Sequence, residues 1–116
     1  MPKTAASRHL TDQEIATIAN QALAAAQEAT QNFLDANGDR DLCGFAWVTL
    51  RPATTRMARW LRQQGVARPA PGGGVQVWNP GGHPTQCITA REQGARAFVK
   101  VMEQHGIRAL ANSRLD

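Results

Sequence analysis

Hydrophobic and polar positions follow a helical period over residues 11–37. Apolar side chains recur there every three or four positions, which predicts an amphipathic helix with one buried face. Thr11 and Glu14 match a capping box at its start, and Gly38 is typical of the position after a helix end. The predicted buried face is rich in alanine, which favours close packing. Its members are Ile15, Ile18, Ala22, Ala25, Ala29 and Phe33.

The next pattern has a period of two and covers residues 43–50. It predicts a β-strand, because successive side chains of a strand point to opposite faces. Phe45, Trp47 and Thr49 fall on one face, and smaller apolar residues fall on the other. Both faces are apolar enough to be covered.

A second helix is predicted after this strand, with Thr54 or Thr55 as its cap and Gly65 at its end. Met57 and Leu61 lie on its inward face. Arginines recur every three residues beside that face, and no acid four positions away on the same helix neutralises them. These arginines are Arg56, Arg59 and Arg62.

Residues 69–87 hold five of the ten glycines and four of the six prolines. A Walker loop needs a lysine at its end, and the chain has no lysine between Lys3 and Lys100. A dinucleotide fingerprint opens a helix, whereas glycines 72–74 lead into a strand. The sequence therefore excludes both phosphate-binding loops.

This segment is instead expected to form a hairpin of strands 75–78 and 85–89. The turn at 79–84 still offers backbone amides to a ligand. A third helix is predicted over residues 90–105, and a last strand begins at 107–110.

The element order after the first helix is thus β-α-β-β-α-β. It predicts an α+β protein with a ferredoxin-like, split βαββαβ antiparallel sheet and an additional long N-terminal helix. That helix either covers Phe45 and Trp47 or mediates a dimer. Gly94 inside the third helix indicates a close approach to another backbone. Residues 1–10 are expected to be flexible, and residues 11–116 to form one domain.

No apolar run approaches the length of a membrane span, and the N-terminus has no hydrophobic leader. We therefore expect a soluble cytoplasmic protein with no membrane partner. Cys43 and Cys87 have no metal spacing and lie near neither a histidine nor a predicted helix start, so both are expected to be ordinary buried thiols. Residues 35–41 depart from a calcium loop. No metal or cofactor is expected.

The formal net charge is +4, but the charges are segregated. Residues 42–91 contain six arginines and no acid, so an anionic partner would meet the middle of the chain. Eleven of the thirteen basic residues are arginine, whose planar fork pairs with phosphate.

Trp78 is the most informative aromatic residue, because it ends a predicted strand beside the glycine turn. It either stacks on a base whose edge Asn79 or Gln86 contacts, or folds onto the sheet. Trp47 and Trp60 are expected in the core. His83 has no neighbouring carboxylate or nucleophile, so enzymatic chemistry is not expected.

The candidate ligand-binding residues are mostly arginines. Arg51 and Arg91 are expected at opposite edges of the sheet, so the arginines do not all converge on one site. The full set is Arg51, Arg56, Arg59, Arg62, Trp78, Asn79, His83, Gln86, Arg91 and Arg114.

The motifs CGFAWV, GGGVQVWNP, GARAFVKVM and SRLD together resemble a family of small bacteriophage-encoded proteins. The resemblance covers residues 43–116 and leaves the first helix out. It implies a phage accessory protein that acts in the cytoplasm of a bacterial host.

Three functional hypotheses follow. The first is a non-enzymatic homo-oligomer that captures an anionic, nucleotide-like ligand and so acts as an anti-defence sponge for a host signalling nucleotide. The second is an RNA or single-stranded DNA binding protein with Phe45 and Trp47 on a bare sheet face. The third is an inhibitor that docks on a host defence protein. The position of the first helix separates the first two, because it decides whether the sheet face is bare.

Overall fold

The computed structural model describes residues 10–40 and 42–116, and it confirms an α+β fold. The predicted flexible segment 1–10 lies outside the described residues except for Leu10, which is buried. None of the described helices is long and apolar enough to span a membrane. The elements are α2 (Asp12–Asn37), β1 (Gly44–Leu50), α3 (Arg56–Gln63), β2 (Arg68–Pro69), β3 (Val75–Trp78), α4 (Ile88–Gln104) and β4 (Leu110–Leu115).

The strands form one sheet in the order β2-β3-β1-β4, and each neighbouring pair is antiparallel. Trp47 of β1 lies opposite Trp78 of β3 and Asn112 of β4. Residues that lie opposite each other in a sheet share a face. These three side chains therefore project from the same side of the sheet.

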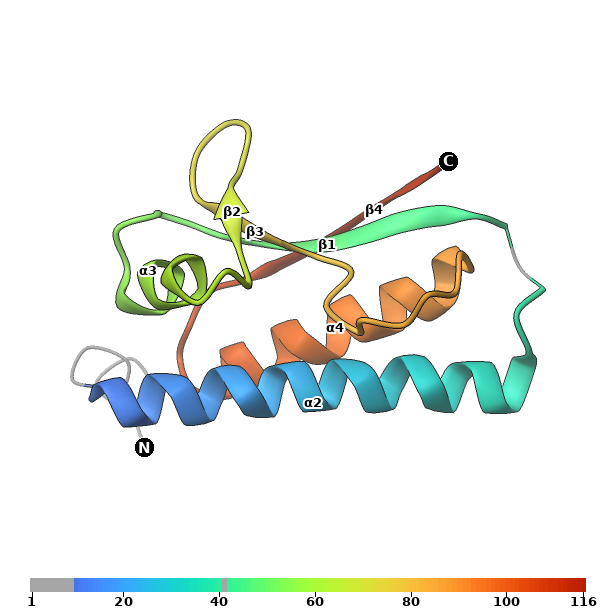
Figure 1. The fold of residues 1–116 in the computed structure, drawn as a ribbon, viewed down its shortest axis with the longest axis horizontal. Coiled ribbons are helices and arrows are strands. Elements are labelled where there is room, and N and C mark those ends of the chain that lie inside the picture. The colour runs from blue at the N-terminus through green and yellow to red at the C-terminus, as the bar shows by residue number, and fades with distance from the viewer. Residues whose placement is uncertain (1–9, 41) are drawn as a thin grey trace.

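The molecule has three layers, which Figure 1 shows with the sheet at the top, α3 and α4 in the middle and α2 at the bottom. α2 packs mainly against α4, with a smaller contact to α3. Of the two alternatives for the first helix, the one in which it covers Phe45 and Trp47 is therefore wrong. Both side chains lie on the face of the sheet that turns away from the helices.

Small residues explain why α2 packs against α4. Ala22 and Ala26 are completely buried, and Thr30 donates from its hydroxyl to the backbone oxygen of Ala90 (3.1 Å). A Cβ on Gly94 would lie 2.5 Å from the Thr30 Oγ1 atom, which confirms the predicted close approach. The two helices can meet at this distance only because no side chain projects from Gly94.

The buried face of α2 differs from the prediction in its second half. Ala25, Ala29 and Phe33 are only half-buried, whereas Ala26 and Thr30 are buried. Because threonine is polar, the sequence did not predict Thr30 on the buried face of the helix. Its hydroxyl is nevertheless satisfied by a carbonyl of α4, which removes most of the cost of burying it.

The predicted capping box at the start of α2 is confirmed. The backbone N–H of Thr11 donates to the Glu14 carboxylate (2.8 Å), and the Thr11 hydroxyl accepts from the Glu14 N–H (3.1 Å). The hydrogen bond from the Thr11 backbone, and then the Thr11 side chain, hold the pKa of Glu14 below its usual value. The caps of α3 also agree with the prediction, since Thr55 accepts from the Ala58 N–H and the helix ends before Gly65.

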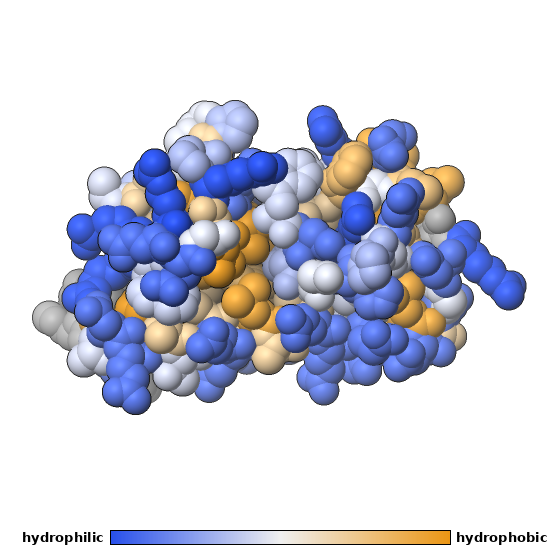
Figure 2. Space-filling model, in the orientation of Figure 1, coloured by the Kyte–Doolittle hydropathy of each residue, from blue (hydrophilic) through white to orange (hydrophobic). Residues whose placement is uncertain are grey.

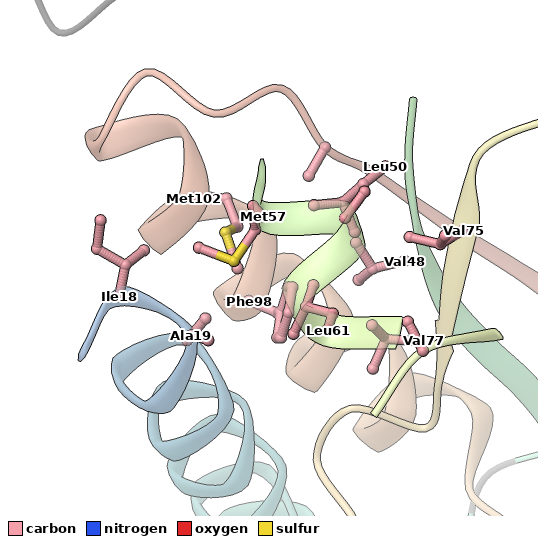
Figure 3. Close-up of a cluster of buried hydrophobic side chains, with 14 of the residues drawn as sticks. Ile18, Ala19, Val48, Leu50, Met57, Leu61, Val75, Val77, Phe98 and Met102 are labelled. Carbon is pink, nitrogen blue, oxygen red and sulfur yellow. The ribbon is translucent and has the colours of Figure 1, made fainter. Parts of the chain in front are cut away.

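The core lies between the sheet and the helices. Figure 3 shows Val48, Val75 and Val77 of the sheet gathered with Leu61 of α3 and Phe98 of α4. All five are at most 2% exposed. The aliphatic face of the sheet is thus the one that the helices cover.

The predicted hairpin of strands 75–78 and 85–89 is wrong, because β3 pairs with β2 instead. Local side-chain contacts explain the error. The Thr85 N–H donates to His83 Nδ1 (3.0 Å), and the Cys87 N–H donates to the Thr85 hydroxyl (3.1 Å). These bonds take the donors that a strand would use, so the chain runs from a turn directly into α4.

Two further boundaries are corrected. α4 begins at Ile88, with Cys87 as its N-cap residue, so the expectation that neither cysteine lies at a helix start is wrong. Cys43 is exposed, although both cysteines were expected to be buried. β4 begins at Leu110 and includes Arg114, which makes the C-terminal residues part of the sheet.

Replacing Gly94 with alanine is expected to reduce the free energy of unfolding by about 1–3 kcal/mol, because the added methyl group collides with Thr30. An ordinary helical glycine gives the opposite sign, a gain of about 1 kcal/mol. In a Thr30→Ala background the closest obstacle is absent, and Gly94→Ala should cost at least about 1 kcal/mol less. Urea unfolding of the four proteins in this cycle measures both effects. A stabilising Gly94→Ala in the parent protein would contradict the packing described.

Candidate functional site

Three aromatic rings lie together on the side of the sheet that the helices leave open. The indoles of Trp47 and Trp78 are stacked, with ring centroids 4.8 Å apart and an interplanar angle of 27°. Phe45 meets Trp78 edge to face, at 6.1 Å and 77°. All three are half-buried, so part of each ring faces solvent. We call this side of the sheet, with Phe45, Trp47 and Trp78, the aromatic face.

Arginines stand beside these rings. The Cζ atom of Arg68 lies 5.4 Å from the centroid of a Trp78 ring, and those of Arg91 and Arg114 lie 5.7 and 5.5 Å from the centroid of Phe45. These are cation–π distances. Arg91 is also held by a hydrogen bond from its Nη1 atom to the backbone oxygen of Gly44 (2.7 Å).

Three arginines bring positive charge to the aromatic face. Within residues 10–40 and 42–116, no carboxylate lies within ion-pair distance of Arg68, Arg91 or Arg114. Figure 2 shows hydrophilic and hydrophobic side chains next to one another along the upper margin of the molecule, where Figure 1 places the sheet. Aromatic surface and positive charge are therefore combined on one side.

A hollow of about 360 Å³ lies on this face between β4 and the loop that joins β2 to β3. Two amide side chains, Gln76 and Asn112, contribute polar groups to it. The Nδ2 atom of Asn112 donates to the hydroxyl of Thr49 (3.1 Å), which fixes the orientation of the amide. The lining residues are Trp47, Thr49, Arg51, Ala70, Pro71, Gln76, Trp78, Asn112 and Arg114.

The glycine loop shapes the rim of this hollow. Glycines 72–74 form the turn between β2 and β3 and lead into the strand at Val75–Trp78, as predicted. Arg51 donates from Nε to the backbone oxygen of Gly73 (3.0 Å). Gly74 has a φ of +81°, and a Cβ there would lie 2.4 Å from the backbone oxygen of Leu50. The loop can lie against the end of β1 only with glycine at this position.

Four of the ten predicted residues belong to the aromatic face. Trp78 is stacked in its centre, Arg114 and Arg91 flank Phe45, and Arg51 lies at the rim of the hollow. Arg51 follows the last residue of β1, whereas Arg91 contacts Gly44, the first residue of β1. The two arginines are therefore at opposite ends of the strand, as predicted.

The three arginines of α3 are elsewhere. Arg59 and Arg62 are exposed on a helix that lies on the other side of the sheet. Arg56 forms an ion pair with Asp12 of α2. The expectation that these arginines stay unneutralised thus fails for Arg56, because an acid far away in the sequence reaches it.

The remaining predicted residues belong to the turn before α4 and its surroundings. Asn79 donates from Nδ2 to the backbone oxygen of His83 (3.0 Å). His83 accepts from the Thr85 N–H, so both residues hold the turn together. Gln86 is exposed beside Arg91, at a smaller hollow of about 170 Å³.

Sequence reasoning assigned no site role to Arg68, Gln76 and Asn112. It expected Trp47 in the core and gave it a binding role only in the nucleic-acid hypothesis. The alternation of Gln76 and Trp78 with buried valines was a usable signal, because it puts both on one face of β3. No comparable signal existed for Arg68, whose strand has only two residues.

Comparison of the chain with protein-family models, with curated proteins and with solved structures found no match. The resemblance to bacteriophage-encoded proteins therefore stays a prediction. Among the described residues, no group of three or more histidine, cysteine or acidic side chains is placed to hold a metal ion.

Proposed function

We propose that the aromatic face binds single-stranded nucleic acid. The observation that carries this proposal is the position of α2, which packs on α4 and leaves Trp47 and Trp78 facing solvent on the open side of the sheet. The sequence alone favoured capture of a small nucleotide-like ligand, and it made the position of the long helix the feature that separates this hypothesis from nucleic-acid binding. With the helix elsewhere, the second hypothesis from the sequence becomes the better one.

Stacking supplies the first part of the chemistry. Bases of an unpaired strand stack on aromatic rings, and each such contact contributes about 1–3 kcal/mol to binding. Trp47 and Trp78 already hold one another in a fixed orientation, so little side-chain entropy is lost when a base packs against them. A duplex hides the faces of its bases, so it cannot use this surface in the same way.

Arginines supply the second part. Guanidinium groups pair with phosphate and also stack on bases. Arg68 lies by Trp78, the central ring, while Arg91 and Arg114 lie by Phe45, so positive charge is spread over two of the three aromatic rings. This arrangement suits the successive phosphates of a strand better than the single phosphate cluster of a small nucleotide.

The arrangement of the sheet and its helices also agrees with this function. We propose that the sheet with α3 and α4 is a ferredoxin-like split βαβ unit, supported by the strand order β2-β3-β1-β4 and by antiparallel pairing throughout. When both helices of such a unit lie on one side, the other face of the sheet is available to a ligand. α2 adds a third layer behind the helices and leaves that face unchanged.

Fluorescence anisotropy with labelled oligonucleotides tests the proposal directly. Single-stranded RNA or DNA of about ten nucleotides should bind at least tenfold more tightly than a duplex of the same length or a mononucleotide. Equal affinity for a mononucleotide would return the small-ligand hypothesis to first place. Equal affinity for the duplex would mean that charge alone drives binding. No binding to any of these ligands would overturn the proposal.

A pair of arginine variants locates the contact. Arg114→Ala should weaken single-strand binding several-fold and lower the slope of log affinity against log salt concentration by about one, because one phosphate contact is lost. Arg62→Ala removes the same charge from an exposed position on α3 and should change the slope little. Binding titrations at several salt concentrations measure both slopes. Equal effects of the two variants would mean that the oligonucleotide does not bind preferentially at the aromatic face.

A further inference from the structure

Cys43 and Cys87 lie directly opposite each other in an antiparallel β-bridge. Two backbone hydrogen bonds flank the pair, from Gly44 N to Gln86 O (3.0 Å) and from Ile88 N to Leu42 O (2.8 Å). The two cysteines themselves exchange no backbone hydrogen bond, and Cα atoms in this type of pair are about 4.5 Å apart. Disulfides join Cα atoms that are about 4.4–6.8 Å apart, so a bond across the pair fits without movement of the backbone.

We propose that this pair is a redox modification site, at which a disulfide forms when the protein meets a low-molecular-weight disulfide such as oxidised glutathione. Both thiols are free in the structure, and they differ in access. Cys43 is exposed, whereas Cys87 is 1% exposed at the N-cap of α4. One cysteine is thus accessible to an oxidant, and the other stands next to it. The proposal is independent of nucleic-acid binding.

The reaction has two thiol–disulfide exchange steps. The Cys43 thiolate attacks one sulfur of glutathione disulfide, which forms a mixed disulfide on Cys43 and releases one glutathione. The Cys87 thiolate then attacks the Sγ atom of Cys43, which forms the internal disulfide and releases the second glutathione. The two cysteines lose two electrons and two protons in total, and the glutathione disulfide gains them.

The bond would tie the residue before β1 to the N-cap residue of α4. It would close a loop that runs from residue 43 to residue 87, and closing a loop of this length restricts the unfolded chain strongly. It would also lie next to the hydrogen bond from Arg91 to Gly44, which holds one end of the aromatic face. Oxidation is therefore expected to stiffen this end of the molecule and to raise its thermal stability.

The experiment is oxidation of the folded protein by glutathione disulfide, followed by intact-mass measurement, thiol titration and thermal unfolding. The wild-type chain should go from two free thiols to none, remain a single chain without a glutathione adduct, and gain about 5–10 °C in Tm. Cys87→Ser, or Cys87→Ala where the serine variant folds poorly, should stop at one glutathione on Cys43. The Cys43→Ser variant should keep its one remaining thiol, that of Cys87, because Cys87 is buried.

Three outcomes would overturn the inference. A wild-type chain that keeps a stable adduct on Cys43 would show that Cys87 does not reach it. Disulfide-linked dimers would show that Cys43 reacts with a second chain instead. Retention of both thiols in the folded protein, when the same protein oxidises readily in urea, would show that the folded geometry prevents the bond.

Discussion

Replacing Trp78 with leucine is expected to weaken the binding of a single-stranded oligonucleotide by about 10- to 100-fold, and Trp47→Leu is expected to do the same. Each substitution removes one of the two stacked indoles, and the remaining indole also loses the neighbour that orients it. The two effects are therefore not expected to add. The double variant should bind little more weakly than either single variant, because each single change already dismantles the stacked surface.

The third tryptophan provides the matched control. Trp60 is half-buried on α3 and packs against the core, away from the aromatic face. Trp60→Leu should lower Tm yet leave the affinity unchanged at temperatures where the protein is folded. Anisotropy titrations and thermal unfolding of all three single variants separate the two properties. If Trp60→Leu weakened binding as much as Trp78→Leu, the loss would follow from stability, and the aromatic face would have no special role.

Local patterns predicted most of the elements of this chain. The capping box at Thr11, the cap at Thr55 and the alternation along β1 depend only on neighbouring residues, and all three are confirmed. Such features are fixed by backbone hydrogen bonding and side-chain period, which are visible within a few residues. The separation of Arg51 from Arg91 was predicted from a strand at 85–89 that the structure does not contain. It holds for another reason, because Arg51 follows β1 whereas Arg91 donates to the first residue of β1.

The errors arose where distant residues decide. Gly94 indicated a close approach but not its partner, and only its contact with Thr30 shows that α2 packs against α4. The same placement decides whether Trp47 lies in a core or on an open face. The wrong hairpin is an exception with local causes. The two residues of β2 carry no periodic signal, and hydrogen bonds between near neighbours around Thr85 replace the strand that the pattern predicted. Composition predicted a positive region but could not show which arginines meet the aromatic rings.

Loss of a phenylalanine on the helix side of the sheet should lower stability more than loss of one on the aromatic face, and this contrast tests the layer order directly. Phe98 of α4 is completely buried between the sheet and α2, so Phe98→Ala should cost about 3–5 kcal/mol of unfolding free energy. Phe45 of β1 is half-buried on the aromatic face, and Phe45→Ala should cost about 1–2 kcal/mol. The milder variant Phe98→Leu keeps the comparison measurable if the alanine variant does not fold.

Binding should show the reverse order. Phe45→Ala removes the ring between Arg91 and Arg114 and should weaken single-strand binding several-fold, whereas Phe98→Leu should leave the affinity unchanged while the protein is folded. Urea unfolding and anisotropy on the same samples measure both quantities. If Phe45→Ala lowered the free energy of unfolding as much as Phe98→Ala, the aromatic face would be covered in solution. A dependence of that loss on protein concentration would identify the cover as a second copy of the chain.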